Sequence, residues 1–227
     1  MIKKIKAFSL AEVILTMALI ATLGAIMLPI LKNVIPEEDV VKFKQVYFGT
    51  LSIINSMAND ALFFPDARGF ANFDEIYDSD VEEYYPGREK FTFLFKDNLN
   101  LMSETPVPVG GTFPYALDED ANGVFTVKNS SNISCYKNTA GAVYCIPPNV
   151  DVFNPDKPGS NDLVLIRVYT NSKSFDISKA FFIGVYADGR VDLPLSIPGY
   201  VDCANSETFR SFNQCQANDY LASKLID

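Results

Sequence analysis

A long apolar run near the N-terminus constrains this chain more than any other feature. Residues 8–31 read FSLAEVILTMALIATLGAIMLPIL, and Glu12 is the one ionisable side chain among them. As a helix these residues span roughly 36 Å, more than the roughly 30 Å hydrocarbon core of a bilayer. Lysines at positions 3, 4 and 6 precede the run, and the positive-inside rule places that end in the cytoplasm. We therefore expect a single membrane span, with the rest of the chain outside the cytoplasm.

Two simpler explanations of this run account for fewer of its features. A removable signal peptide has a shorter apolar region, of about 7–15 residues, with a small-residue cleavage site after it. Here the run is longer, and the small residue Ala7 comes before it. A plain signal anchor fits the length and the flanking charge but gives no reason for Glu12. Carboxylates inside membrane segments are costly and usually functional.

The segment as a whole resembles the N-terminus of a type IV pilin or a type II secretion pseudopilin. The family pattern is a short basic leader, a small residue, a Phe, a Glu four residues later and a long apolar helix. Here the leader is MIKKIKA, with Ala7 where Gly is usual, and Phe8 and Glu12 follow. Pro29 matches a helix-distorting proline common in the family. The resemblance covers roughly the first thirty residues.

This resemblance implies a maturation and an assembly pathway. A prepilin peptidase would cut between Ala7 and Phe8 and methylate the new Phe8 amine. The apolar helix would lie in the lipid of the bacterial inner membrane, beside the assembly platform, with the N-terminus cytoplasmic. It would then form the core of a cell-surface or periplasmic filament with other pilin or pseudopilin subunits. Glu12 would pair with the Phe8 ammonium of a neighbouring subunit, because an unpaired buried charge is strongly penalised.

Four parts of the chain follow from this interpretation. They are the leader (1–7), the transmembrane and filament-core helix (8–31), a continuation of that helix packed on the head (32–62) and an extracytoplasmic globular head (63–227). Pro36 and the three acids after it suit the first turn of a helix. Apolar residues then recur in steps of three and four, which predicts one buried helical face: Val40, Phe43, Tyr47, Leu51, Ile54, Ala58 and Ala61.

The head is expected to combine short helices with antiparallel strands. The segments 73–85 and 89–102 favour short helices. Apolar runs rich in Val, Ile, Phe and Tyr predict strands at 124–127, 142–146, 163–169 and 181–186. Asp188-Gly189 is a favoured hairpin turn. The predicted fold class is therefore α+β, a long N-terminal helix packed on an antiparallel sheet, as in pilins.

Four cysteines lie in the part expected outside the cytoplasm, where disulfides persist. Cys135 and Cys145 are ten positions apart, and Cys203 and Cys215 are twelve apart. Three pairings are possible, and the short gaps favour the sequential one. Each closed loop then contributes about 2.5–3 kcal/mol by the chain-entropy estimate. No CxxC spacing and no histidine support a metal or redox site instead.

Composition excludes several classes of function. The 19 basic and 28 acidic residues give a net charge of −9, which argues against nucleic-acid binding through a basic face. Histidine is absent, which removes Ser-His-Asp and Cys-His catalysis and the common zinc sites.

Asp118, Asp120 and Asn122 open a calcium-loop pattern, but Asn129 stands where the bidentate Glu belongs. The same residues suit a turn. We predict no cofactor.

The sequence therefore predicts a structural subunit and not an enzyme. The subunit is a major pilin, a minor pilin or a pseudopilin of a type IV pilus or type II secretion filament. The alternative is an envelope-anchored binding protein or enzyme that uses the helix only as a tether. Processing between Ala7 and Phe8 distinguishes the two, because a plain anchor needs none.

Overall fold

The computed structural model describes residues 11, 13–22, 38–80, 82–157, 160–170, 175, 180–204 and 213–224. The chain divides into two compact units, Met1–Val41 and Lys42–Asp227. In the first unit, residues 11 and 13–22 are helical. Most of the run expected to cross a membrane, 8–31, lies outside the described residues. Among the helices that are described, none has both the length and the apolar character needed for a membrane span.

Helix α2 (Glu38–Ala58) begins two residues after Pro36 and packs one face against the head. Its fully buried side chains recur in steps of three and four, as the periodicity of an amphipathic helix requires: Phe43, Val46, Thr50, Ile54 and Met57. The buried Thr50 hydroxyl donates to the Val46 carbonyl, 2.8 Å away, so it does not lack a partner. The helix ends at Ala58, and Ala61 therefore lies beyond it.

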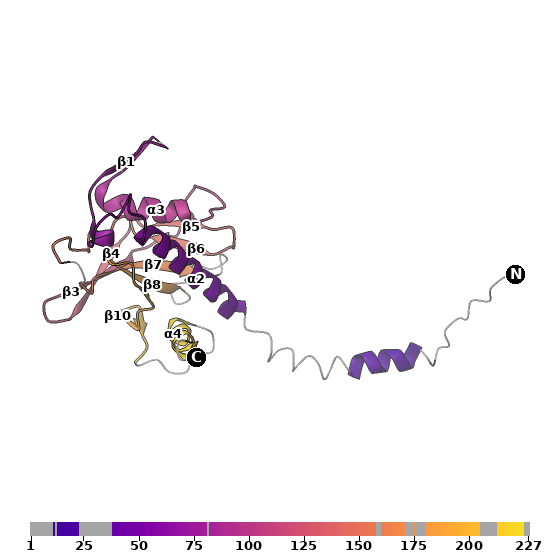
Figure 1. Ribbon diagram of the computed structural model, residues 1–227. Coiled ribbons are helices and arrows are strands. Elements are labelled where there is room, and N and C mark those ends of the chain that lie inside the picture. The colour runs from indigo at the N-terminus through magenta and orange to yellow at the C-terminus, as the bar shows by residue number, and fades with distance from the viewer. Residues whose placement is uncertain are drawn as a thin grey trace. The chain divides into compact units, whose positions relative to one another are not determined.

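The main sheet is antiparallel and has seven strands (Figure 1). They are β3 (Phe113–Glu119), β4 (Phe125–Ser130), β5 (Ser134–Lys137), β6 (Val143–Ile146), β7 (Leu163–Tyr169), β8 (Phe181–Tyr186) and β9 (Val191–Asp192). One edge of β7 pairs first with β3 and then with β6, and its other edge pairs with β8. Because β3 and β6 share one edge of β7, the sheet divides there and curls.

Every residue of β7 is buried, which means that both faces of the sheet are covered. Val164, Ile166 and Val168 face the larger apolar core, which contains side chains of α2 and of α3 (Lys90–Asn98). These two helices therefore cover the same face of the sheet (Figure 1). Leu163, Leu165 and Tyr169 belong to a second, smaller core on the opposite face. Side chains alternate between faces along a strand, so Arg167 points into that second core.

Several shorter elements surround the sheet. The 3-10 helices η1 (Gly69–Ala71) and η2 (Gly87–Glu89) flank a hairpin formed by β1 (Ile76–Asp78) and β2 (Glu83–Tyr85). A second small hairpin joins β10 (Ser196–Ile197) to β11 (Val201–Asp202). Helix α4 (Gln214–Lys224) is the last described element. The fold is thus α+β, with N-terminal helices and a curled antiparallel sheet.

Some of the sequence predictions for these elements are confirmed, one is wrong, and some strands were missed. The predicted strands 163–169 and 181–186 coincide with β7 and β8, and the helix predicted within 89–102 is α3. The Asp188-Gly189 turn joins β8 to β9, with Gly189 in the left-handed region at φ 85°. The short helix predicted over 73–85 is wrong, because Ile76–Asp78 and Glu83–Tyr85 pair as the β1–β2 hairpin. Strands β3 and β5 were not predicted.

Candidate functional site

The three residues to which the family resemblance gives a role in maturation and docking are Ala7, Phe8 and Glu12. All three lie outside the described residues. The helical residues that follow, 13–22, are described, and their large apolar side chains leave 39–70% of their surface exposed. Exposed apolar side chains of this kind suit contact with lipid or with other apolar side chains.

Two hydroxyl groups in this helix have hydrogen-bond partners within the helix itself. Thr16 Oγ1 donates to the Val13 carbonyl and Thr22 Oγ1 to the Leu19 carbonyl, each over 2.9 Å. A hydroxyl that bonds back to its own helix needs no water or external partner. The helix can therefore enter apolar surroundings without leaving these two groups unsatisfied.

The structure pairs the cysteines as Cys135–Cys145 and Cys203–Cys215, the sequential pairing that the spacing favours. Cys135 and Cys145 lie directly opposite one another on β5 and β6. Cys203 follows β11 and Cys215 lies in the first turn of α4, so this bond ties α4 to the head. The two disulfides indicate an extracytoplasmic protein, because disulfides persist in oxidising compartments.

A buried arginine lies beside the first disulfide. Arg167 is 1% exposed, and its Nη2 lies 3.3 Å from Cys145 Sγ and 3.8 Å from Cys135 Sγ. Its guanidinium carbon lies 3.4 Å from the centroid of the Phe113 ring, and burial lowers the pKa of the group. Among the residues that the structure describes, its buried Nε and Nη1 have no hydrogen-bond partner. The signal for this site was present in the sequence as a lone charge inside the apolar run 163–169.

A glutamine side chain holds the start of α4 against the sheet. Gln214 Oε1 accepts a hydrogen bond from the Phe182 amide at 3.0 Å, while Nε2 donates to the Phe182 carbonyl at 2.8 Å. Nε2 also reaches the Pro194 carbonyl at 3.3 Å. Phe182 pairs with β7 on one side only. The Gln214 amide therefore takes the place of a strand residue at this point of the β8 edge, next to Cys215.

A second buried cation anchors the start of α3. Lys90 is fully buried, and its Nζ donates to the Phe63 carbonyl (2.6 Å), Asn72 Oδ1 (3.2 Å) and the Asp74 carbonyl (3.2 Å). Nζ also lies 4.7 Å from the centroid of the Phe64 ring. Loss of hydration lowers the pKa of this ammonium to about 8, although nearby carboxylates oppose the shift. All three donors are used, so this lysine has a structural role.

Of the residues of the calcium-like pattern, Asp118 lies in β3, Asn129 lies in β4, and Asp120 and Asn122 lie in the turn between these strands. Asp120 Oδ1 accepts hydrogen bonds from the Asn122 and Val124 amides, at 2.8 and 2.9 Å. These bonds lower the pKa of Asp120. Asp118 forms an ion pair with Lys128 at 3.1 Å. In the described part of the chain, no three Cys, Asp or Glu residues come together in a way that could hold a metal ion.

A polar cleft of about 440 Å³ lies beside this turn. Its lining includes the carboxylates of Asp118 and Asp151 and the ammonium of Lys157. Asp151 accepts a hydrogen bond from the Tyr115 hydroxyl at 3.2 Å, and Asp162 accepts one from the Glu119 amide at 2.8 Å. These carboxylates therefore serve as hydrogen-bond acceptors that hold the ends of strands and loops together.

Comparisons with models of protein families, with curated proteins and with solved structures find no match to this chain.

Proposed function

We propose that this chain is a prepilin-like subunit of a type IV pilus or of a type II secretion filament. One observation carries the proposal, namely the order of residues at the N-terminus. A leader with three lysines ends at Ala7, and Phe8, Glu12 and an apolar run to residue 31 follow it. A removable signal peptide would not keep so long a run, and a simple tether has no use for a carboxylate inside it.

In this proposal, cleavage after Ala7 frees the Phe8 amine, which is the positively charged partner of Glu12. A prepilin peptidase hydrolyses the Ala7–Phe8 bond and methylates the Phe8 amine, which remains a cation. Phe8 and Glu12 are separated by about 6 Å of helix rise. Subunits that stack with a matching axial offset therefore bring Glu12 of one beside the Phe8 ammonium of the next. A buried charge without its partner costs about 3–5 kcal/mol, so the pair selects one register between subunits.

The described residues support this proposal in two ways. The exposed apolar side chains of residues 13–22, with their internally bonded threonines, suit first the lipid of the inner membrane and then a packed filament core. Helix α2 buries one face in the head, as the proposal expects for the part of the N-terminal helix that packs on the head. The further partners are the inner-membrane assembly platform and other pilin or pseudopilin subunits.

Blocking the cleavage tests this proposal directly in the native host. With Ala7→Glu we expect a chain that keeps the leader, remains in the inner membrane and is missing from sheared filaments. Lys6→Gln is the matched control, because it also changes the leader but leaves the cleaved bond intact, and it should mature normally. The head is identical in both variants. If the wild-type chain and the Ala7→Glu chain both retain the leader and share the same location, the helix is only a tether.

A further inference from the structure

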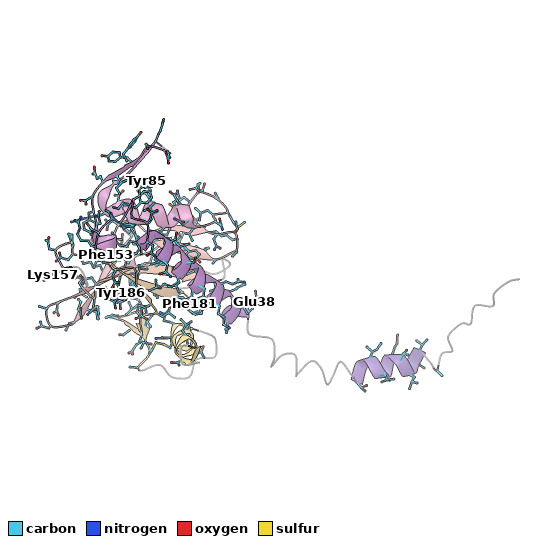
Figure 2. All side chains as sticks on the ribbon, in the orientation of Figure 1. Glu38, Tyr85, Phe153, Lys157, Phe181 and Tyr186 are labelled. Carbon is cyan, nitrogen blue, oxygen red and sulfur yellow. A yellow bond between two sulfur atoms is a disulfide. The ribbon has the colours of Figure 1, made fainter. Side chains whose placement is uncertain are left out.

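The β1–β2 hairpin is separate from the main sheet and projects from the head (Figure 1). Its residues pair as Ile76 with Tyr85 and Tyr77 with Tyr84. The first pair faces inward, since Ile76 packs against the larger core and the buried Tyr85 ring meets Phe63 edge to face at 5.2 Å. Tyr85 is labelled where the hairpin meets the head (Figure 2). The base of the hairpin is therefore fixed to the protein interior.

The second pair faces outward. Tyr77 and Tyr84 are each 57% exposed, and their ring centroids are 5.9 Å apart at an interplanar angle of 43°. Single exposed apolar residues are ordinary, but two adjacent aromatic rings on a projecting element form a prepared contact surface. Tyrosine is among the residues that contribute most to binding at protein interfaces.

Charge around the pair identifies the kind of partner. From Gly69 to Gly87 the chain has six acids and no lysine or arginine. The nearest preceding base, Arg68, is held by Asp66 and Asp74 at 2.6 and 2.9 Å. The same hairpin face of a second copy would be repelled, because it carries the same six acids. A positively charged surface is the complementary partner.

We propose that the outward face of the β1–β2 hairpin, formed by Tyr77 and Tyr84, binds an arginine-rich surface of another protein. Guanidinium groups stack on tyrosine rings and also pair with carboxylates, so one side-chain type satisfies both features of the hairpin. The acids bring the partner to the hairpin, and the two rings provide the contact. This inference does not depend on the role of the N-terminal segment in filaments.

The test measures binding of a fluorescent octa-arginine peptide to the full oxidised chain in detergent, by anisotropy at about 0.15 M salt, where long-range attraction is screened. Tyr77→Ser with Tyr84→Ser leaves the charge unchanged and removes only exposed rings. We expect this variant to bind on the order of tenfold more weakly than wild type. Octalysine has the same charge without planar groups and should bind wild type more weakly than octa-arginine.

Two charge-matched variants separate the hairpin from general acidity. Glu75→Gln with Glu82→Gln neutralises one acid directly before the hairpin and one in its turn, and Asp156→Asn with Asp219→Asn neutralises two acids elsewhere in the head. The hairpin pair should weaken binding severalfold more than the distant pair. Equal effects of the two pairs, or unchanged binding after loss of both tyrosines, would overturn the proposal. So would binding of a neutral oligosaccharide in place of the arginine peptide.

Discussion

Arg167 Nη2 lies 3.3 Å from Cys145 Sγ, inside the smaller core of the head. The oxidised disulfide carries no charge, so the buried guanidinium has a weak sulfur acceptor where a carboxylate would ordinarily lie. Reduction by a dithiol adds two electrons and gives two thiols, and ionisation of either would supply a negative partner for the arginine. The Arg167 cation therefore stabilises the reduced form of the Cys135–Cys145 pair, and the bond is easier to reduce than it would be in a protein without this cation.

The first prediction concerns the reducibility of this bond. Arg167→Gln should require a more strongly reducing dithiothreitol buffer to open Cys135–Cys145, because the reduced state loses its cation. A tenfold change in the reduced-to-oxidised ratio corresponds to about 30 mV. Alkylation of thiols followed by peptide mass analysis measures each bond separately. Arg167→Lys keeps the charge and should behave like wild type, while Cys203–Cys215 serves as an internal reference. An Arg167→Gln protein in which the reduction potentials of both disulfides equal those of wild type would contradict this role.

The second prediction concerns the attachment of α4. Gln214→Ala removes three hydrogen bonds to the backbone of Phe182 and Pro194. Each buried polar group left without a partner costs about 1–3 kcal/mol, so we expect a loss of about 2–4 kcal/mol in the free energy of unfolding. Urea denaturation of the oxidised chain measures this loss in the free energy of unfolding. Gln216→Ala is the matched control, since Gln216 is exposed and accepts one bond of 3.2 Å. Equal losses in the two variants would show that the Gln214 contacts do not hold α4.

The third prediction concerns pH and Lys90. The pKa of Lys90 is about 8 in the folded chain, against 10.5 for a lysine that is exposed to water. Between these values the unfolded chain binds more protons, so the free energy of unfolding rises with pH in this window. The free-energy cost of burying the charged Lys90 ammonium is fully present below about pH 8 and is relieved above that pH, where the group loses its proton. Relative to Lys90→Met, wild type should gain about 1 kcal/mol between about pH 7 and about pH 9. If the difference in the free energy of unfolding between wild type and Lys90→Met does not change with pH, the pKa of Lys90 is not lowered in the folded chain.

The sequence predicted those elements whose signals are local. The strands β7 and β8 are apolar runs with at most one charge, and the Asp188-Gly189 turn between β8 and β9 has one strongly preferred geometry. Two cysteine pairs with short gaps also favour one pairing without reference to the rest of the fold. For these elements, the properties of neighbouring residues determine the structure.

The elements that were missed depend on contacts between distant residues. The acidic segment 73–85 forms a hairpin because Ile76 and Tyr85 pack on the core, and tertiary packing here overrides local propensity. Strand β3 contains Pro114, next to which its pairing with β4 shifts register, so its sequence lacks a regular strand signal. The roles of Arg167 and Gln214 follow from neighbours that are far away in the sequence.

The fourth prediction concerns Glu12 in filament assembly. Glu12→Gln keeps the size of the side chain but removes the charge that would meet the Phe8 ammonium of a neighbour. Insertion and cleavage should survive, whereas the ratio of filament-bound to membrane-bound chain should fall, because an unpaired buried charge costs about 3–5 kcal/mol. Asp156→Asn removes one exposed acid from the head and should assemble like wild type. The tagged variant itself is followed, so that wild-type subunits do not conceal its defect. Normal assembly of Glu12→Gln would exclude the charge pair.

The most direct measurement is the N-terminus of the native chain isolated from the cell envelope. Intact-mass analysis and N-terminal peptide sequencing should find a chain that begins at N-methylated Phe8. Loss of Lys3, Lys4 and Lys6 leaves 16 basic and 28 acidic residues, a change in formal net charge from −9 to −12. A native chain that still begins with MIKKIKA would contradict the central claim that this protein is a processed filament subunit.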